Sequence, residues 1–195
     1  MRGDFKLADF GQDEDLWSGA NNKPLFQRVE ICWRPPVAIE NDGSLSIDNE
    51  EDVYQNGYLY SIVRNHHSQA TKDKIAYIGI TNDLKKRFRN HPKVDEIRGL
   101  QGQAGISVGV ITTPGRRPNG TDRVLIREEL EHILIWVLWE DLWNDRKCLV
   151  VPGQGKNGGR AYDITNTGFA FSGRMPRRIV YPWAAIIPRR NNTAR

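Results

Sequence analysis

The stretch YIGITNDLKKRFRNH, residues 77–91, runs from the end of an apolar strand into a basic helix. Its first triplet closes the apolar run KIAYIG, and residues 81–83 then supply side-chain oxygens of the kind that cap helices. Arg87 and His91 follow four positions apart, so they share one face of the predicted helix. The stretch predicts either a solvated basic helix behind a buried strand or a strand and helix that present Arg87 and His91 to a substrate.

Apolar patterning around this stretch predicts a regular central unit. Segments 58–63 (YLYSIV) and 74–80 (KIAYIGI) read as an antiparallel strand pair, and 105–112 (GISVGVIT) as a third strand. Gly109 within the third strand suggests a bulge or a close approach of another segment. A helix is predicted at 123–139 (RVLIREELEHILIWVLW). The predicted order is strand, strand, helix, strand, helix.

Charge is distributed unevenly along the 195 residues, whose formal net charge is +4. Residues 1–50 carry ten acidic and five basic side chains, whereas residues 145–195 carry ten basic and two acidic ones. We therefore divide the chain into an accessory segment 1–50, a core 51–145 and a basic extension 146–195. The extension alternates arginines with an apolar stretch, so we expect it to pack on the core and to face a polyanion such as DNA. A solubilising tail is the alternative.

The composition excludes several classes of protein. No apolar run approaches the roughly 18 residues of a membrane span, so no membrane association is expected. Cys32 and Cys148 are the only cysteines, and their spacing fits neither a metal site nor a redox motif. The start MRGDFKLADF lacks the apolar core of a signal peptide, which favours a cytoplasmic location.

Glu131 is the most informative anomaly in the predicted second helix. Eight of the ten residues in LEHILIWVLW (130–139) are apolar, so most of the helix surface should be buried. A buried carboxylate is costly unless it meets a cation or several hydrogen-bond donors. Two interpretations stay open: a buried ion pair with an arginine, or a ligand for a hard cation such as Mg²⁺, which takes few ligands from protein.

Together, these motifs resemble the GIY-YIG nuclease family over residues 57–145. YLYSI (58–62) is similar to the first half-motif with Tyr60 as its tyrosine, and AYIGIT matches the second at Tyr77. NDLKKR places Arg87 at the family's arginine, EHILI places Glu131 at its glutamate, and LWN places Asn144 at its asparagine. The step from Arg87 to His91 is similar to the restriction-endonuclease branch.

The first half-motif departs from the family pattern at one position. Tyr58 replaces the glycine of GIY, and Gly57 lies one position earlier. Tyr58 and Tyr60 lie on the same face of the predicted strand, so Tyr58 remains an alternative for the first tyrosine of the motif.

The resemblance implies an α+β fold with a small antiparallel three-stranded sheet flanked by helices, extended at both termini. It also implies hydrolysis of phosphodiesters with Mg²⁺ or Mn²⁺ held by Glu131. Arg87 would grip the phosphate and Tyr60 would accept a proton from the attacking water, while Tyr77 and His91 would position the reactants and Asn144 would support the site. The alternative is that none of these residues is catalytic. Tyr60 and Tyr77 would then be ordinary sheet aromatics, and Arg87 a surface residue. His91 would be a helix-terminal cation and Asn144 a turn residue.

The leading functional hypothesis is a metal-dependent, site-specific DNA endonuclease of restriction type. A structure-selective or single-strand nuclease of repair or mobile elements is the first alternative, and a DNA-binding module without catalysis is the second. Cutting both strands with one active site would call for a homodimer or two successive events. The predicted DNA contacts are Arg116, Arg117, Lys156, Arg160, Arg174, Arg177, Arg178, Arg189 and Arg190.

Overall fold

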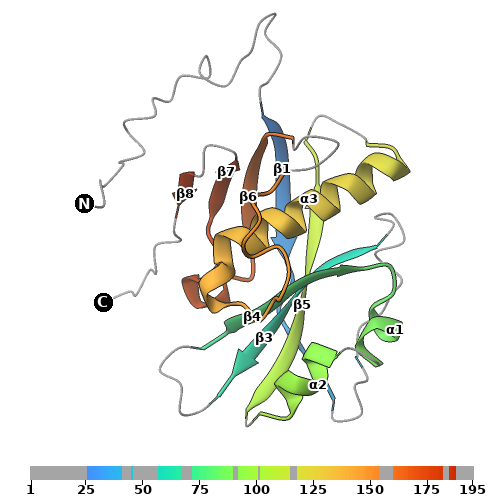
Figure 1. The fold of residues 1–195 in the computed structure, drawn as a ribbon, viewed down its shortest axis with the longest axis vertical. Coiled ribbons are helices and arrows are strands. Elements are labelled where there is room, and N and C mark those ends of the chain that lie inside the picture. The colour runs from blue at the N-terminus through green and yellow to red at the C-terminus, as the bar shows by residue number, and fades with distance from the viewer. Residues whose placement is uncertain are drawn as a thin grey trace, which may run out of the picture.

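One mixed β-sheet organises the part of the chain that the structure describes (Figure 1). The computed structural model describes residues 26–40, 45, 57–66, 72–89, 92–100, 102–114, 118–153, 160–181 and 185–187. The strands are β1 (Gln27–Trp33), β2 (Val37–Ala38), β3 (Tyr58–Asn65), β4 (Lys74–Thr81), β5 (Gln103–Thr112), β6 (Tyr162–Gly168), β7 (Arg178–Tyr181) and β8 (Ala185–Ile187). The helices are α1 (Leu84–Arg89), α2 (Pro92–Arg98) and α3 (Gly120–Leu138), with short 3-10 turns at Trp139–Asp141 and Phe171–Gly173.

The strand order in the described part of the sheet is β4-β3-β5-β1-β6-β7-β8, and β2 pairs with β5. The pairs β4–β3, β3–β5 and β5–β1 are antiparallel, as are β6–β7 and β7–β8. The exception is β1, which runs parallel to β6 with Gln27 opposite Tyr162. This parallel pair makes the sheet mixed and joins residues that are more than 130 positions apart.

Helix α3 covers one face of the sheet, which it crosses in Figure 1. It begins at the cap residue Asn119, whose side-chain Oδ1 accepts the Asp122 amide at 2.8 Å. Its apolar residues pack in one cluster with side chains from β1, β3, β4, β6 and β7, namely Val29, Ile31, Trp33, Leu59, Val63, Ile75, Ile78, Tyr162, Ile164, Ile179 and Tyr181. The main core therefore draws on both ends of the chain.

A second core lies on the opposite face, beneath α1 and α2. Leu84 and Phe88 of α1 and Ile97 of α2 pack there with alternate residues of the central strands. Tyr58, Tyr60 and Ile62 of β3 belong to this cluster, whereas Leu59 and Val63 belong to the α3 cluster. Because successive strand residues point to opposite faces, β3 is buried on both sides.

The prediction of a small three-stranded sheet flanked by helices is wrong. The strands expected at 58–63, 74–80 and 105–112 form, but they are one part of the larger mixed sheet, to which both predicted extensions contribute strands. The 19-residue helix α3 is about 28 Å long, whereas three strands cover roughly 14 Å. Its apolar surface needs the additional strands β1, β6 and β7 for burial.

Gly109 explains how β1 joins β5. Trp33 of β1 lies opposite Gly109, and a Cβ atom on this glycine would lie 2.8 Å from the Ile31 side chain and 3.2 Å from the Trp33 ring. The close approach that the glycine suggested is therefore the packing of β1, and it provides partners for the backbone groups on that edge of β5.

Candidate active site

Tyr60 and Tyr77 meet on neighbouring strands of the sheet. Tyr60 of β3 lies opposite Gly79 of β4, and Ile62 lies opposite Tyr77. The two tyrosine rings stack with their centroids 6.2 Å apart. A Cβ atom on Gly79 would lie 2.6 Å from the Tyr60 hydroxyl oxygen, so only glycine leaves room for that ring. The glycine of the YIG triplet is thus required by the tyrosine on the adjacent strand.

Arg87 reaches this tyrosine pair from α1. Asp83 caps the helix by accepting the Lys86 amide at 2.9 Å, and Phe88 anchors it with its ring 5.1 Å from that of Tyr60. The Arg87 side chain forms hydrogen bonds with the phenol groups of both Tyr60 and Tyr77. Burial opposes the charged form, but the hydrogen bonds and the charge interactions with the two phenols together outweigh it and raise the pKa of Arg87 above its ordinary value.

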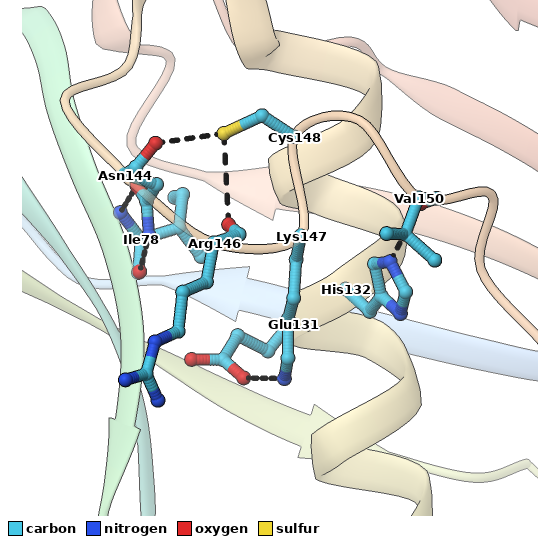
Figure 2. Close-up of polar contacts among 8 residues, drawn as sticks. All are labelled: Ile78, Glu131, His132, Asn144, Arg146, Lys147, Cys148 and Val150. Atoms are coloured by element: carbon cyan, nitrogen blue, oxygen red, sulfur yellow. Dashed lines mark hydrogen bonds and ion pairs between the residues drawn. The ribbon is translucent and has the colours of Figure 1, made fainter.

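Glu131 contributes a carboxylate from α3, the helix that covers the face of the sheet opposite α1 and α2. The residue is 9% exposed, and its charge acts on both tyrosines, where it favours the protonated phenols. Lys147 holds the carboxylate through a contact of 2.5 Å between its Nζ atom and Glu131 Oε2. Figure 2 shows the second carboxylate oxygen pointing away from Lys147. Glu131 therefore lies in an ion pair, with a lysine rather than the arginine that was considered.

Arg127 lies one helical turn before Glu131 and is 4% exposed. Its Nη2 atom donates to Asn82 Oδ1 at 2.9 Å, which connects α3 to the segment just before α1. Burial lowers the pKa of Arg127, and the charges of Glu128 and Glu131 act in the opposite direction. A Cβ atom on Gly57 would lie 2.1 Å from Arg127 Nη1, so the glycine preceding β3 makes room for this guanidinium.

The structure also distinguishes Tyr60 from Tyr58. Both are buried on the second-core face of β3. Tyr60 is the one that stacks on Tyr77 and bonds to Arg87, whereas Tyr58 lies opposite Thr81 at the beginning of the strand. The geometry therefore favours Tyr60 as the first tyrosine of the cluster.

Asn144 supports the site from outside. Its side-chain amide donates to the Ile78 carbonyl at 2.8 Å and accepts the Ile78 amide at 3.1 Å (Figure 2). The Trp143 amide adds a bond of 2.8 Å to the Ala76 carbonyl. The segment after α3 thus pairs with the outer edge of β4 on both sides of Tyr77, which fixes the position of that side chain.

Burial sets the protonation state of the two tyrosines. Tyr60 is fully buried, and its pKa is raised well above the ordinary value of 10.0, chiefly by the loss of solvent around the phenol. Burial also raises the pKa of Tyr77, which is partly exposed. Arg87 acts in the opposite direction on both. Both phenols are neutral near pH 7 and donate or accept hydrogen bonds as such.

Tyr60→Phe should reduce the sensitivity of the fold to alkali. An unfolded tyrosine ionises near pH 10, whereas the folded protein keeps Tyr60 neutral, so its contribution to stability is complete below pH 10 and declines as the pH rises above it. Urea unfolding should show the wild-type protein losing about 1.5 kcal/mol more than the variant between pH 10 and 11.5. Equal losses would show that the Tyr60 phenol ionises in the folded protein.

The predicted DNA-contacting arginines within the described residues are mostly engaged inside the chain. Arg178 forms a two-pronged bond with Asp163, with both N···O distances at 2.7 Å. Arg174 contacts Asp141 at 2.8 Å, and Arg160 contacts Asp122 at 3.0 Å. Arg177 is exposed. The remaining predicted residues lie outside the described residues: His91, Arg116, Arg117, Lys156, Arg189 and Arg190.

Some charged residues near the cluster were missed by the sequence reasoning. Lys85, Lys86 and Arg89 are exposed on α1, the helix that carries Arg87. The run LKKRFR already contained this signal, since its buried Leu84 and Phe88 leave the basic positions to solvent. Arg127 also had a sequence signal, since it lies four positions before Glu131 in the predicted helix and so on the same face. Lys147 gave no comparable signal, because its contact with Glu131 depends on the folded chain.

A divalent cation at Glu131 would have few ligands from the protein. No group of three or more histidine, cysteine, aspartate or glutamate side chains suited to a metal occurs among the described residues. Glu131 nevertheless offers a carboxylate that already binds a cation, the Lys147 ammonium. A hard cation such as Mg²⁺ often takes one or two carboxylates and completes its shell with water and phosphate oxygens. Such a donor set suits Mg²⁺ or Mn²⁺ better than zinc, which prefers nitrogen and sulfur ligands.

Comparisons with known proteins identify no similar protein. No family model, curated protein or solved structure matches the chain. In the part of the chain that the structure describes, none of the helices has the length and apolar character needed to cross a membrane.

Proposed function

We propose that the chain is a metal-dependent DNA endonuclease of the GIY-YIG type. One observation carries the proposal: Tyr60 of β3 and Tyr77 of β4 stack with their ring centroids 6.2 Å apart, Arg87 of α1 interacts with both phenols, and the charge of Glu131 of α3 acts on both. Sequence spacing gave no guarantee that four such elements would converge. These four residues are also the positions that the resemblance to the nuclease family selects.

Arg87 is the phosphate-binding group of the proposed site. Arg87 is exposed on α1, and the phenol groups of Tyr60 and Tyr77 orient its guanidinium. A planar guanidinium offers paired N–H donors to phosphate oxygens and stays charged at any working pH. Held in this way, it meets the negative charge that develops on the phosphate without having to reorganise.

Glu131 is the proposed metal ligand. A divalent cation bound there would polarise the scissile phosphate and stabilise the departing oxygen. Neutral Tyr60 and Tyr77 orient Arg87 through their hydroxyl groups. Tyr77 is the more exposed of the two, so it is the phenol better placed to hydrogen-bond an incoming water. Tyr60 takes up or relays a proton only when its phenolate is favoured by a neighbouring positive charge.

The exposed basic residues of α1 give the site a surface that favours a polyanion. Lys85, Lys86 and Arg89 lie on the helix that presents Arg87. Phosphate neutralisation by such side chains supplies sequence-independent affinity for DNA. The α1 surface is thus a better supported DNA contact than the arginines that pair with Asp122, Asp141 and Asp163.

Incubation with supercoiled plasmid and Mg²⁺ tests the proposed function. We expect nicked and linear products in Mg²⁺ or Mn²⁺ and none in EDTA, and sequencing the ends identifies the class of nuclease. Unique ends indicate a site-specific enzyme, while scattered ends indicate a structure-selective or nonspecific one. Intact plasmid, with DNA still bound in a mobility-shift assay, would contradict catalysis and favour a binding module.

Arg177 and Arg178 are adjacent, which allows a matched test of DNA contact. Arg177→Ala should lower the slope of log affinity against log salt by roughly 0.9, the value for one phosphate contact. Arg178→Ala should leave the slope unchanged and instead lower the unfolding free energy by about 1 kcal/mol, because Arg178 holds Asp163. Fluorescence anisotropy at several salt concentrations and urea unfolding provide the measurements. An unchanged slope for Arg177→Ala would remove this side chain from the DNA surface.

A further inference from the structure

Lys147 occupies the carboxylate to which the metal is assigned. Its Nζ atom lies 2.5 Å from Glu131 Oε2, and Figure 2 shows its side chain extending from the loop after α3 down to Glu131. The Lys147 side chain is 36% exposed, whereas that of Glu131 is 11% exposed. The lysine therefore occupies one of the two carboxylate oxygens, Oε2.

The loop that carries Lys147 is anchored on both sides of it. The Cys148 thiol donates to the Asn144 carbonyl at 2.8 Å, and His132 Nε2 lies 2.8 Å from the Val150 carbonyl oxygen (Figure 2). Lys147 itself has φ 68°, a left-handed conformation that residues other than glycine seldom adopt. The chain thus maintains an uncommon backbone geometry at the residue whose ammonium meets Glu131.

We propose that Lys147 is a displaceable counter-cation of Glu131. The ammonium neutralises the carboxylate in the metal-free protein and leaves it when a divalent cation binds. This inference rests on the proposed function, in which Glu131 is the metal ligand. It assigns to Lys147 a role that neither the sequence motifs nor the resemblance includes.

Electrostatics gives the displacement its direction. Two cations on one carboxylate repel each other, and a divalent ion attracts that carboxylate more strongly than an ammonium does at the same distance. The lysine stem is flexible and partly exposed, so the ammonium can turn toward water while the anchored loop keeps its place. Lys147 therefore stabilises the metal-free protein and weakens metal binding, because the metal must first replace it.

Titration with Mn²⁺, followed by electron paramagnetic resonance without DNA, tests this role. Lys147→Met should bind Mn²⁺ about 10-fold more tightly than the wild-type protein, which corresponds to about 1.4 kcal/mol. Lys147→Gln, which keeps a polar group beside the carboxylate, should change affinity in the same direction. Arg146→Met is the matched control: it removes one positive charge from the adjacent, exposed position and should change affinity by less than about twofold.

Thermal unfolding provides a second readout. In EDTA, Lys147→Met should unfold at a lower temperature than Arg146→Met because Glu131 has lost its counter-cation, and saturating Mn²⁺ should raise its Tm by more than it raises that of the wild-type protein.

The variants also separate two kinds of failure. Loss of the Mn²⁺ site in Glu131→Gln, together with wild-type affinity in both Lys147 variants, would overturn the role of Lys147 and leave the proposed function standing. Wild-type Mn²⁺ binding by Glu131→Gln would overturn the metal assignment and, with it, both proposals.

Discussion

Glu131→Gln should abolish plasmid cleavage, lowering the rate in Mg²⁺ by about 10³-fold or more, because it removes the charge that holds the metal. Glutamine keeps the size of the side chain and can still accept a hydrogen bond from Lys147, so the fold should be retained. Single-turnover cleavage at saturating DNA measures the loss. A mobility-shift assay should show DNA affinity close to that of the wild-type protein.

Glu128→Gln is the matched control for this variant. Glu128 lies on the same helix and is exposed, whereas Glu131 is buried and its charge acts on Tyr60 and Tyr77. The Glu128→Gln variant should cleave at a rate close to that of the wild-type protein. If Glu131→Gln also cleaved normally, Glu131 would not be the metal ligand.

The second large effect is expected at Arg87. Arg87→Met should lower the cleavage rate at saturating DNA by about 10²- to 10³-fold, the range for removing one preorganised donor from a developing oxyanion. Arg87→Lys should recover only part of the loss, since an ammonium keeps the charge but lacks the planar fork that meets two phenols and a phosphate. Single-turnover rates for the three proteins give the ranking.

Lys86 provides the comparison for the arginine variants. Lys86→Met removes a charge from the next position on α1, where the side chain is exposed. Its effect should fall on DNA affinity and its salt dependence rather than on the rate at saturation. Similar rate losses for Lys86→Met and Arg87→Met would mean that α1 contributes general positive charge and that Arg87 has no specific role.

The local features of the cluster could be predicted from the sequence. The apolar run before Gly79 and the oxygen-bearing residues after it determine a strand that ends at a capped helix, and Asp83 is the residue that caps it. Glu131 stood out because a carboxylate within an apolar helix needs a partner. Each of these inferences uses residues within one turn or one strand, where covalent geometry restricts what the neighbours can do.

Pairings between distant segments could not be predicted in the same way. β1 joins β5 through Gly109 and runs parallel to β6, and its apolar alternation fits many partners equally well. Arg178 was predicted to contact DNA, but the pairing of β6 with β7 places Asp163 beside it, and the two side chains bind each other. The contact between Lys147 and Glu131 is made from a loop in which Lys147 has a positive φ, a conformation that a lysine in the sequence does not predict.

A crystal structure of the protein with a DNA substrate and Ca²⁺, a metal expected to bind without supporting cleavage, tests the proposed active site most directly. We predict a Ca²⁺ ion on Glu131, a backbone phosphate between that ion and the Arg87 guanidinium, and the Lys147 ammonium turned away from the carboxylate. DNA bound on another surface, with Lys147 still paired to Glu131 and no phosphate at Arg87, would contradict the proposal.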